Sequence, residues 1–357
     1  MAPSRSRVIS PSPAESTRMN LTPTLPILDF SLLNGGADDQ QRFRDELLKA
    51  AHEVGFFYLV GHGIPDEDFD SMIELAQRFF ALPEADKLAI ENTHSPHFRG
   101  YTRVGGELTR GQADWREQID IGAERPARGP ETPGYEEDFW RLEGPNLWPA
   151  ALPELRPATQ AWMDRLSEIS LRLLAAWAQS LGAPADIFEP AFATNPSSLL
   201  KIVRYPGADD QSQGVGSHKD LGVLTLLYVE EGKRGLQVDK DGQWIDAPPI
   251  PRAFVVNIGE LLEAATDGYL KATLHRVESP AAGSDRISIP FFYAPALDAT
   301  IPTLDLPPAL AAEAAGVTRD PNNPIHPVYG RNWLKSRLRA HPNVVEAHYP
   351  HLVSSDH

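Results

Sequence analysis

Two histidines, an aspartate, an arginine and a serine in the second half of the chain have types and spacing that could form a single site. His218 and Asp220 are two positions apart, just before an apolar run. Alternate side chains of an extended strand point to the same face, so this spacing predicts an imidazole beside a carboxylate. His275 falls in a second strand-like segment, and Arg286 and Ser288 alternate in a third.

An imidazole pair with one carboxylate suits iron(II), manganese or zinc. Two histidines and one carboxylate that leave coordination positions open are typical of non-haem iron(II) sites. The sequence therefore predicts a metal site made by His218, Asp220 and His275. The other nine histidines have no partner at ligand spacing, so we interpret them as surface or turn residues. The glycine pairs do not follow a strand in the pattern of a phosphate-binding loop, which disfavours nucleotide binding.

Composition restricts the kind of ligand. The 357 residues include 33 basic and 49 acidic side chains, which gives a formal charge of -16. Such a charge disfavours nucleic acid and anionic membranes as partners and favours a small molecule. The chain contains no cysteine, which excludes disulfides and thiolate metal sites. It also lacks a long apolar run and a signal-peptide pattern, so we predict a cytoplasmic protein. Its oligomeric state is not specified by these features.

The hydrophobic pattern predicts helices first and strands later. Helical spacing occurs at 38–54, 66–80 and 153–181, and short β runs follow from 198 to 293. Closely spaced strands with Gly, Pro and Asp turns predict a mainly β fold with flanking helices, built on a jelly-roll core behind a helical N-terminal region. The predicted parts are a flexible tail at 1–24, an N-terminal α/β region at 25–150, a support helix and connector at 151–194, a jelly-roll core at 195–300, and a C-terminal extension at 301–357 that could cover the site.

These residues together resemble a known family. His-x-Asp, a gap of some fifty residues, His, about ten more and then Arg-x-Ser is the pattern of iron(II)- and 2-oxoglutarate-dependent oxygenases of the isopenicillin N synthase-like family. The resemblance extends to Gly-Phe-Phe-Tyr-Leu-Val-Gly-His-Gly-Ile at 55–64 and Asn-Ile-Gly-Glu-Leu-Leu at 257–262. It therefore spans residues 25 to about 300 and implies a double-stranded β-helix fold.

The resemblance implies roles for individual residues. Arg286 and Ser288 would bind the remote carboxylate of 2-oxoglutarate, since a guanidinium beside a hydroxyl makes a charge-assisted clamp. Tyr205 matches a tyrosine that contacts the cosubstrate in relatives. Relatives commonly have an asparagine two residues earlier, where this chain has Val203. The implied requirements are Fe(II), 2-oxoglutarate and O2, with ascorbate supporting activity in vitro, and no catalytic side chain beyond the metal ligands.

The implied activity is oxidative decarboxylation of 2-oxoglutarate to succinate and CO2, coupled to hydroxylation or desaturation of a small molecule. Three alternatives remain open at this point: an oxygenase that forms ethylene and succinate from 2-oxoglutarate, a ring-closing oxidase that needs no keto acid, and a metal-binding jelly roll without turnover. Arg99, Tyr101 and Phe292 are predicted to border the substrate, because an aromatic loop with a cation at 97–106 and the end of the last strand should meet above the metal.

Overall fold

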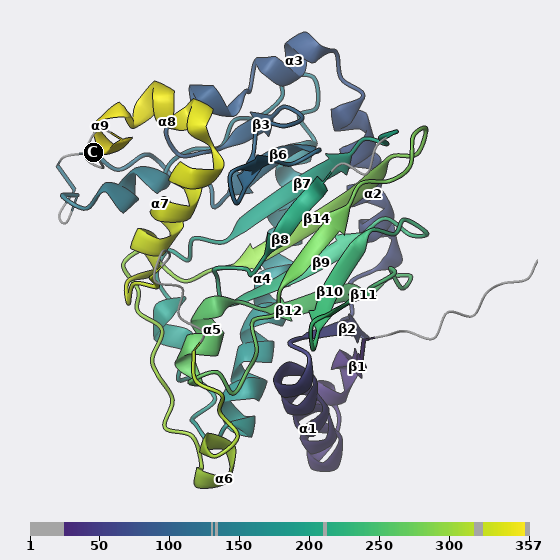
Figure 1. Cartoon of the computed structure of the whole chain (residues 1–357), viewed down its shortest axis with the longest axis vertical. Coiled ribbons are helices and arrows are strands. Elements are labelled where there is room, and N and C mark those ends of the chain that lie inside the picture. Colours follow the sequence, from purple (N-terminus) through teal and green to yellow (C-terminus); the bar gives the residue numbers. More distant parts are fainter. Residues whose placement is uncertain (1–24, 130, 133–134, 210–212, 318–323, 354–357) are drawn as a thin grey trace, which may run out of the picture.

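The computed structural model describes residues 25–129, 131–132, 135–209, 213–317 and 324–353, so the predicted tail at 1–24 lies outside the described residues. Two β-sheets face one another at the centre of the molecule, with helices packed around them (Figure 1). This arrangement is the jelly roll that the strand pattern predicts. The proposed boundaries between the parts of the chain stay predictions.

The larger sheet has eight strands in the order β1-β2-β12-β9-β14-β7-β6-β3. Its strands are β1 (Ile27–Asp29), β2 (Phe56–Val60), β3 (Gly100–Thr102), β6 (Glu117–Gly122), β7 (Leu199–Tyr205), β9 (Leu224–Val229), β12 (Phe254–Ile258) and β14 (Arg286–Tyr293). The smaller sheet has the order β11-β10-β13-β8. Its strands are β8 (Gln213–His218), β10 (Leu236–Lys240), β11 (Gln243–Asp246) and β13 (His275–Glu278). A separate hairpin pairs β4 (Leu108–Thr109) with β5 (Gln112–Ala113).

Each strand of the larger sheet has an inner face, which looks toward the smaller sheet, and an outer face. Val203 and Tyr205 of β7 pack on the inner face with Val215 and Val277 of the smaller sheet. Side chains alternate along a strand, so Arg286 and Ser288, which pair with Tyr205 and Val203, share this inner face.

Helices cover the outer face of the larger sheet. Trp162 of the longest helix stacks edge-on against Phe69 and belongs to the same core as Leu226 of β9. The α-helices are α1 (Ala37–Glu53), α2 (Asp66–Phe80), α3 (Glu84–Leu88), α4 (Leu155–Ser180), α5 (Glu260–Ala265), α6 (Pro308–Ala311), α7 (Tyr329–Ala340), α8 (Pro342–His348) and α9 (Pro350–Val353). The 3-10 helices are η1 (Phe30–Asn34), η2 (Asn92–His94), η3 (Asp138–Leu142) and η4 (Glu189–Ala191).

Gly55 ends α1 and ties the N-terminal region to the jelly roll. Its φ is +73°, and a Cβ there would lie 2.1 Å from the carbonyl oxygen of Lys271, so only glycine fits this conformation and this approach. The neighbouring Val54 carbonyl accepts a hydrogen bond from Thr273 Oγ1 at 2.6 Å. The chain before β2 is thereby held against the segment that leads to His275.

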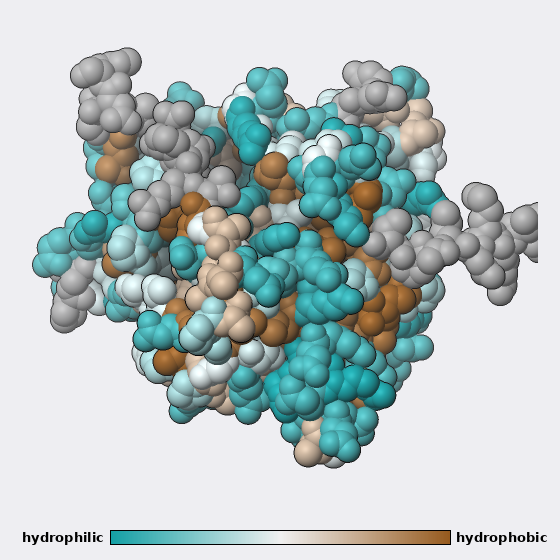
Figure 2. Space-filling view, turned by 60° about the horizontal axis from the view of Figure 1, so that its bottom comes forward, coloured by the Kyte–Doolittle hydropathy of each residue, from teal (hydrophilic) through white to brown (hydrophobic). Residues whose placement is uncertain are grey.

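The surface of the molecule is largely hydrophilic. On the face shown in Figure 2, hydrophilic residues predominate and hydrophobic residues reach the surface in separate patches. Among the described residues, no helix combines the length and the apolar character needed to cross a membrane.

Candidate metal centre and cosubstrate site

The structure brings the two predicted histidine ligands together as neighbours on adjacent strands. His218 is the last residue of β8 and His275 the first of β13, and the two are direct partners in the antiparallel pairing. Their ring centroids are 4.3 Å apart. His218 Nδ1 lies 2.8 Å from the Gly216 carbonyl and His275 Nδ1 lies 3.1 Å from the Thr273 carbonyl. A proton on each Nδ1 would satisfy these carbonyls and leave each Nε2 free to bind a metal.

Asp220 completes the cluster from a position just beyond the strand. The expectation that His218 and Asp220 share one strand is wrong in detail, because β8 ends at His218 and Asp220 lies two residues beyond it. The Asp220 carboxylate nevertheless lies 3.5 Å from His218 Nε2 and 3.6 Å from His275 Nε2, both measured to Oδ1. One ligand atom from each of the three residues lies within 4.8 Å of the others.

The other carboxylate oxygen of Asp220 is held by the larger sheet. Oδ2 accepts hydrogen bonds from Thr225 Oγ1 at 2.6 Å and from Asn257 Nδ2 at 2.8 Å. Both donors come from the inner face, where Thr225 of β9 pairs with Asn257 of β12. Oδ1 is therefore directed to the two imidazoles, as a monodentate ligand would be.

The electrostatics of the cluster favour a cation. Burial would raise the pKa of Asp220, but the two neighbouring imidazoles and the hydrogen bonds from His218 and Asn257 hold this pKa well below its usual value, so the carboxylate is ionised. Burial would lower the pKa of His218, but Asp220 raises it, so a metal would have to displace a proton from this imidazole. Burial and the neighbouring His218 lower the pKa of His275 to about 4, so its imidazole is neutral at pH 7. An ionised carboxylate and a neutral imidazole are the forms that bind metals.

A second acidic residue braces both ligand segments. Glu263 of α5 accepts hydrogen bonds from Lys219 Nζ at 3.0 and 3.1 Å and from the Ala272 backbone N–H at 3.0 Å. Lys219 lies between two ligands in the sequence, and Ala272 lies three residues before the third. The first turn of α5 also donates a backbone hydrogen bond from Glu260 to the Asp220 carbonyl.

We expect Asn257→Ala to weaken iron(II) binding by about 10- to 100-fold, the usual effect of losing a hydrogen bond that orients a metal ligand. The variant removes the amide that fixes Asp220 Oδ2, while every ligand remains. Anaerobic titration with iron(II) followed by calorimetry measures the change. The matched control is Asn146→Ala, which removes a buried asparagine bonded to Gly122 instead. Equal iron affinity in the Asn257 variant and the wild type would contradict this role.

Arg286 is a buried cation on the inner face of the larger sheet. We use the word chamber for this inner face, with the Asp220 anchors Thr225 and Asn257, together with the metal cluster. Arg286 is 1% exposed, and none of its three guanidinium nitrogens has a hydrogen-bond acceptor among the described residues. Its guanidinium carbon lies 4.8 Å from the centre of the Tyr205 ring, and burial lowers its pKa. A desolvated charge without an anionic partner is strongly destabilising. This cation therefore fits an anionic ligand, and Ser288 on the same face would add a hydroxyl.

Arg204 cannot replace Arg286 in this arrangement. It lies on the outer face of β7, where its guanidinium donates to Asp285 Oδ2 at 2.6 and 2.9 Å and to Glu117 Oε1 at 2.6 Å. Both carboxylates neutralise it there.

The three predicted substrate contacts have different fates. Tyr101 pairs with Ile119 on the outer face, packs against Phe79 and donates to Glu117, so the structure does not bring it to the chamber. The reason is strand alternation: residues 100–102 form β3 instead of a loop. Phe292 is a half-buried inner-face residue that pairs with Thr225, beside the anchor of Asp220.

Arg99 is buried on the inner face, at the end of β6. Its guanidinium donates to the carbonyls of His97 and Leu142 and lies where a Cβ of Gly122 would be. Burial and the neighbouring Arg337 lower its pKa to about 10.

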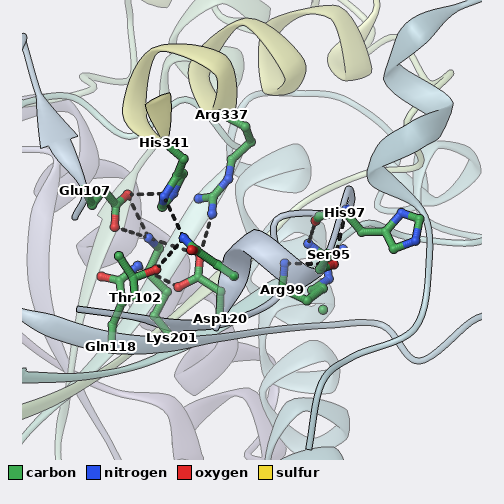
Figure 3. A network of polar contacts seen from close by, with 12 residues as sticks. Ser95, His97, Arg99, Thr102, Glu107, Gln118, Asp120, Lys201, Arg337 and His341 are labelled. Carbon is green, nitrogen blue, oxygen red and sulfur yellow. Dashed lines mark hydrogen bonds and ion pairs between the residues drawn. The ribbon is translucent and has the colours of Figure 1, made fainter. Parts of the chain in front are cut away.

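A network of alternating charges runs along the inner face to α7, and Figure 3 shows its part around Glu107, Lys201, Asp120 and Arg337. We call it the inner charge network, and its members, each less than a tenth exposed, are Asp114, Arg116, Glu107, Lys201, Asp120 and Arg337. Successive members are ion-paired at 3.0, 3.2, 2.8, 3.4 and 2.5 Å.

The network begins at the strand that carries His218. Asp114 Oδ1 accepts hydrogen bonds from the Gly216 backbone at 3.3 Å and from Gln213 Nε2 at 3.0 Å. At its other end, Arg337 Nη2 reaches Asp120 from the C-terminal segment. The chamber thus has a charged wall that runs along the inner face from the strand of His218 to α7.

His341 makes the stability of this wall depend on pH. It is fully buried, with Nε2 3.6 Å from Glu107, and burial together with Arg337 lowers its pKa to about 3. In the unfolded chain it would titrate near 6.5, so below that pH the unfolded state binds more protons and stability falls.

Between pH 7.5 and 5.5 this one group should cost about 1.4 kcal/mol of unfolding free energy. Urea unfolding at the two pH values measures the decrease in unfolding free energy. In His341→Gln this decrease should be smaller than in the wild type by about 1.4 kcal/mol. The half-exposed His351 provides the control variant His351→Gln, with a pH dependence like that of the wild type. Equal losses in all three proteins would contradict this prediction.

The residues present fit an iron(II) ion and a dicarboxylate keto acid. His218, Asp220 and His275 would hold the metal, and the orphaned Arg286 would hold the far carboxylate. When bound, iron(II) supplies the redox chemistry by which O2 is activated and the keto acid is decarboxylated. The protein fixes the ligands, orients the keto acid and keeps the inner face dry.

Several residues that build this site were given no role by the sequence pattern. Asn257 falls within the quoted Asn-Ile-Gly-Glu-Leu-Leu stretch, but its contact with Asp220 depends on the pairing of β9 with β12. Glu263 and the inner charge network have no local motif. Polar residues at strand positions that should be buried, such as Lys201 between Leu200 and Ile202, were the available signal.

Comparison with known proteins agrees with this geometry. Residues 25–151 match the family model described as "non-haem dioxygenase in morphine synthesis N-terminal", and residues 196–295 match the "2OG-Fe(II) oxygenase superfamily". The chain is 36% identical to the 2-oxoglutarate-dependent dioxygenase frbJ of Dothideomycetidae sp. (strain 11243), over 93% of this chain and 94% of that protein. It is 33% identical to a homoarginine-6-hydroxylase of Arabidopsis thaliana, over 90% of each chain.

Solved structures show the same fold. A full-length protein of Neurospora crassa, crystallised in complex with alpha-KG and 5-formyluracil, superposes with a TM-score of 0.70 at 25% identity, covering 88% of this chain and 96% of that one. A putative 2OG-Fe(II) oxygenase family protein from Caulobacter crescentus gives 0.71 at 31% identity, over 89% and 99% of the two chains. The chain therefore belongs to the 2OG-Fe(II) oxygenase superfamily, within its isopenicillin N synthase-like branch, and is an oxidoreductase that uses iron(II), 2-oxoglutarate and O2.

Proposed function

We propose that the protein hydroxylates a small polar molecule that itself carries ionised groups. The observation that carries this proposal is the inner charge network, which shares the inner face with Arg286 and begins at the strand that carries His218. An apolar substrate would leave these buried charges unsolvated next to a hydrocarbon surface. A substrate with its own charges or hydrogen-bonding groups would solvate them instead.

Amino acids with a second ionised group are the first class to test. Homoarginine-6-hydroxylases of Arabidopsis thaliana, Oryza sativa and Glycine max are 32–35% identical to this chain. A guanidino amino acid combines a carboxylate with cations, so both signs of charge in the wall could be matched. L-homoarginine is therefore the first candidate substrate, with L-arginine, L-lysine and thymine as comparison compounds.

In the proposed reaction the substrate, 2-oxoglutarate and O2 give the hydroxylated product, succinate and CO2. One oxygen atom enters the product and the other enters succinate. In this proposal Arg286 and Ser288 bind the far carboxylate of 2-oxoglutarate, Tyr205 packs on the guanidinium, and Phe292 borders the substrate beside Asp220. His218, Asp220 and His275 hold the iron. The role of the protein is to bring the substrate to the open side of the metal and to exclude bulk water.

The test supplies iron(II), ascorbate and 2-oxoglutarate and measures succinate release with and without each compound, together with the product mass. A compound of the proposed class should stimulate succinate release and gain one oxygen atom. Stimulation only by the uncharged thymine would contradict the proposal.

The same assay separates the alternatives. Loss of two hydrogens from the compound would indicate desaturation or ring closure, and ethylene in the headspace would indicate fragmentation of 2-oxoglutarate itself. Substrate oxidation without added keto acid would indicate the ring-closing class. Absence of succinate under every condition would indicate a binding protein without turnover.

A further inference from the structure

Lys201 is a buried cation on the wall of the chamber, held by a carboxylate from another part of the chain. It is 5% exposed and points from β7 onto the inner face. Glu107 binds it through both oxygens, at 2.8 and 2.9 Å, while Asp120 lies farther away at 3.4 Å. The counter-ion that Lys201 depends on is therefore Glu107, because Asp120 is engaged by Arg337 at 2.5 Å.

The position of Lys201 suits a substrate contact. The strand register places Lys201 of β7 on the inner face. Strand β14 lies beside β7, and β9 lies beside β14. Strand β9 carries Thr225, which binds Asp220. Neighbouring strands are about 4.8 Å apart, so Lys201 is roughly 10 Å across the sheet from the strand of Thr225. A molecule of amino-acid size can span such a distance.

Glu107 comes from a segment outside the two larger sheets. It directly precedes β4, and β4 pairs with β5 in its own two-stranded sheet, not with the strands of the two larger sheets. Lys201, by contrast, sits in the middle of β7, which is paired on both sides with β6 and β14. One partner of this ion pair is thus held inside the larger sheet, and the other belongs to a separate hairpin.

A carboxylate from outside could replace Glu107 at little electrostatic cost. Glu107 is held by Lys201 and by Arg116 at 3.2 Å, and both cations would meet the same charge and the same two oxygens in a ligand carboxylate. If Glu107 moved away and no ligand carboxylate replaced it, Lys201 and Arg116 would keep only Asp120 and Asp114 as acidic partners. The exchange therefore selects ligands that carry a carboxylate.

We propose that Lys201 anchors the carboxylate of the prime substrate, and that Glu107 occupies this position while no substrate is bound. The inference rests on the proposed function and makes it narrower: the substrate is a carboxylic acid, and oxidation takes place at a carbon remote from the carboxylate. Glu107 acts as an internal competitor, so its removal should expose the anchor to other carboxylates.

The first experiment uses acetate as the probe and does not depend on turnover. Glu107→Ala leaves a space of about the size of acetate beside Lys201 and Arg116. Acetate should raise the midpoint temperature of thermal unfolding of this variant, and the increase should saturate with acetate concentration. Sodium chloride at equal ionic strength should not raise it. The wild type and the double variant Glu107→Ala/Lys201→Met should not respond. The double variant should fold, because Asp120 keeps Arg337 as its partner and Arg116 keeps Asp114.

The second experiment compares L-homoarginine with its carboxamide in the succinate assay. The wild type should prefer the acid by about 10- to 100-fold in kcat/KM, since a hydrogen bond to a charged group has that effect. Lys201→Met should lose this preference. The control is Lys87→Met, which breaks the ion pair with Glu117 on the outer side of the sheet and should leave the preference intact.

The outcomes separate the two proposals. If no compound stimulates the wild type, the proposed function fails, while the acetate experiment still decides whether Lys201 accepts an external carboxylate. An acetate effect that survives in the double variant, or none in Glu107→Ala, would overturn the anchor. An unchanged preference for the acid in Lys201→Met would also overturn the anchor. The same holds if Lys201→Met keeps the preference and Arg99→Gln loses it, because the carboxylate would then be bound by Arg99.

Discussion

Asp220→Ala should abolish turnover and iron binding while leaving the fold intact. This carboxylate is the one anionic member of the metal cluster, and its removal leaves two imidazoles 4.3 Å apart with nothing to neutralise the metal. We expect the same loss of activity for His218→Ala and His275→Ala, because each removes one of three protein ligands. Metal analysis of the purified proteins and the succinate assay measure both losses, with about one iron per chain expected in the wild type.

A matched control shows that any loss is specific to the cluster. His62→Ala removes an imidazole that packs against Phe69 and Phe254 and contacts the Arg252 carbonyl, on the outer side of the sheet. This variant should keep iron and activity. Circular dichroism and the thermal midpoint check that all variants are folded. Normal turnover in Asp220→Ala would refute the assignment of the metal site, whatever the other variants do.

Arg286→Gln is expected to weaken the apparent affinity for 2-oxoglutarate by about 10- to 1,000-fold. Removing one partner of a desolvated ion pair costs roughly 3 to 5 kcal/mol, a hydrogen bond to a charged group about 1.5 to 3 kcal/mol, and 1.4 kcal/mol corresponds to tenfold. Iron affinity should change little, since the arginine would contact the far end of the keto acid. Ser288→Ala should show a smaller loss, because a neutral hydrogen bond contributes about 0.5 to 1.5 kcal/mol.

The measurement is an anaerobic titration of the iron-loaded protein with 2-oxoglutarate. Arg204→Gln is the control, because this arginine lies on the opposite side of the sheet from Arg286 and is neutralised by Asp285 and Glu117. If Arg204→Gln weakened binding and Arg286→Gln did not, the carboxylate clamp would lie on the outer face and the present description of the chamber would be wrong.

Local patterns in the sequence were sufficient to predict the site residues that lie on strands. Alternation and spacing predicted that His218, His275 and Arg286 would lie on strand segments, and the structure has β8, β13 and β14 at these positions. Helical spacing likewise predicted α1, α2 and α4 to within two residues at each end. These features depend on the period of the side chains, which is encoded locally.

Contacts between distant segments could not be predicted in this way. Tyr101 illustrates the difficulty, because it faces the outer side while its neighbours Gly100 and Thr102 face the inner side. A shift of one residue in the pairing of β3 with β6 would move each of these three residues to the other face. The inner charge network joins residues 107 to 337 through five separate segments, and no spacing rule relates them. Asp220 reached the cluster from beyond its strand because Thr225 and Asn257 bind its other oxygen.

The most direct test of the account is the optical titration of the anaerobic iron(II) protein with 2-oxoglutarate. A keto acid bound to iron(II) through two oxygens gives a visible charge-transfer absorption, which reports on metal and cosubstrate together. The wild type should develop this absorption with saturation at one 2-oxoglutarate per iron. Arg286→Gln should develop it only at much higher 2-oxoglutarate, and Asp220→Ala should not develop it at all. Wild-type absorption and affinity in both variants would contradict the assignment of this chamber as the site of iron and 2-oxoglutarate.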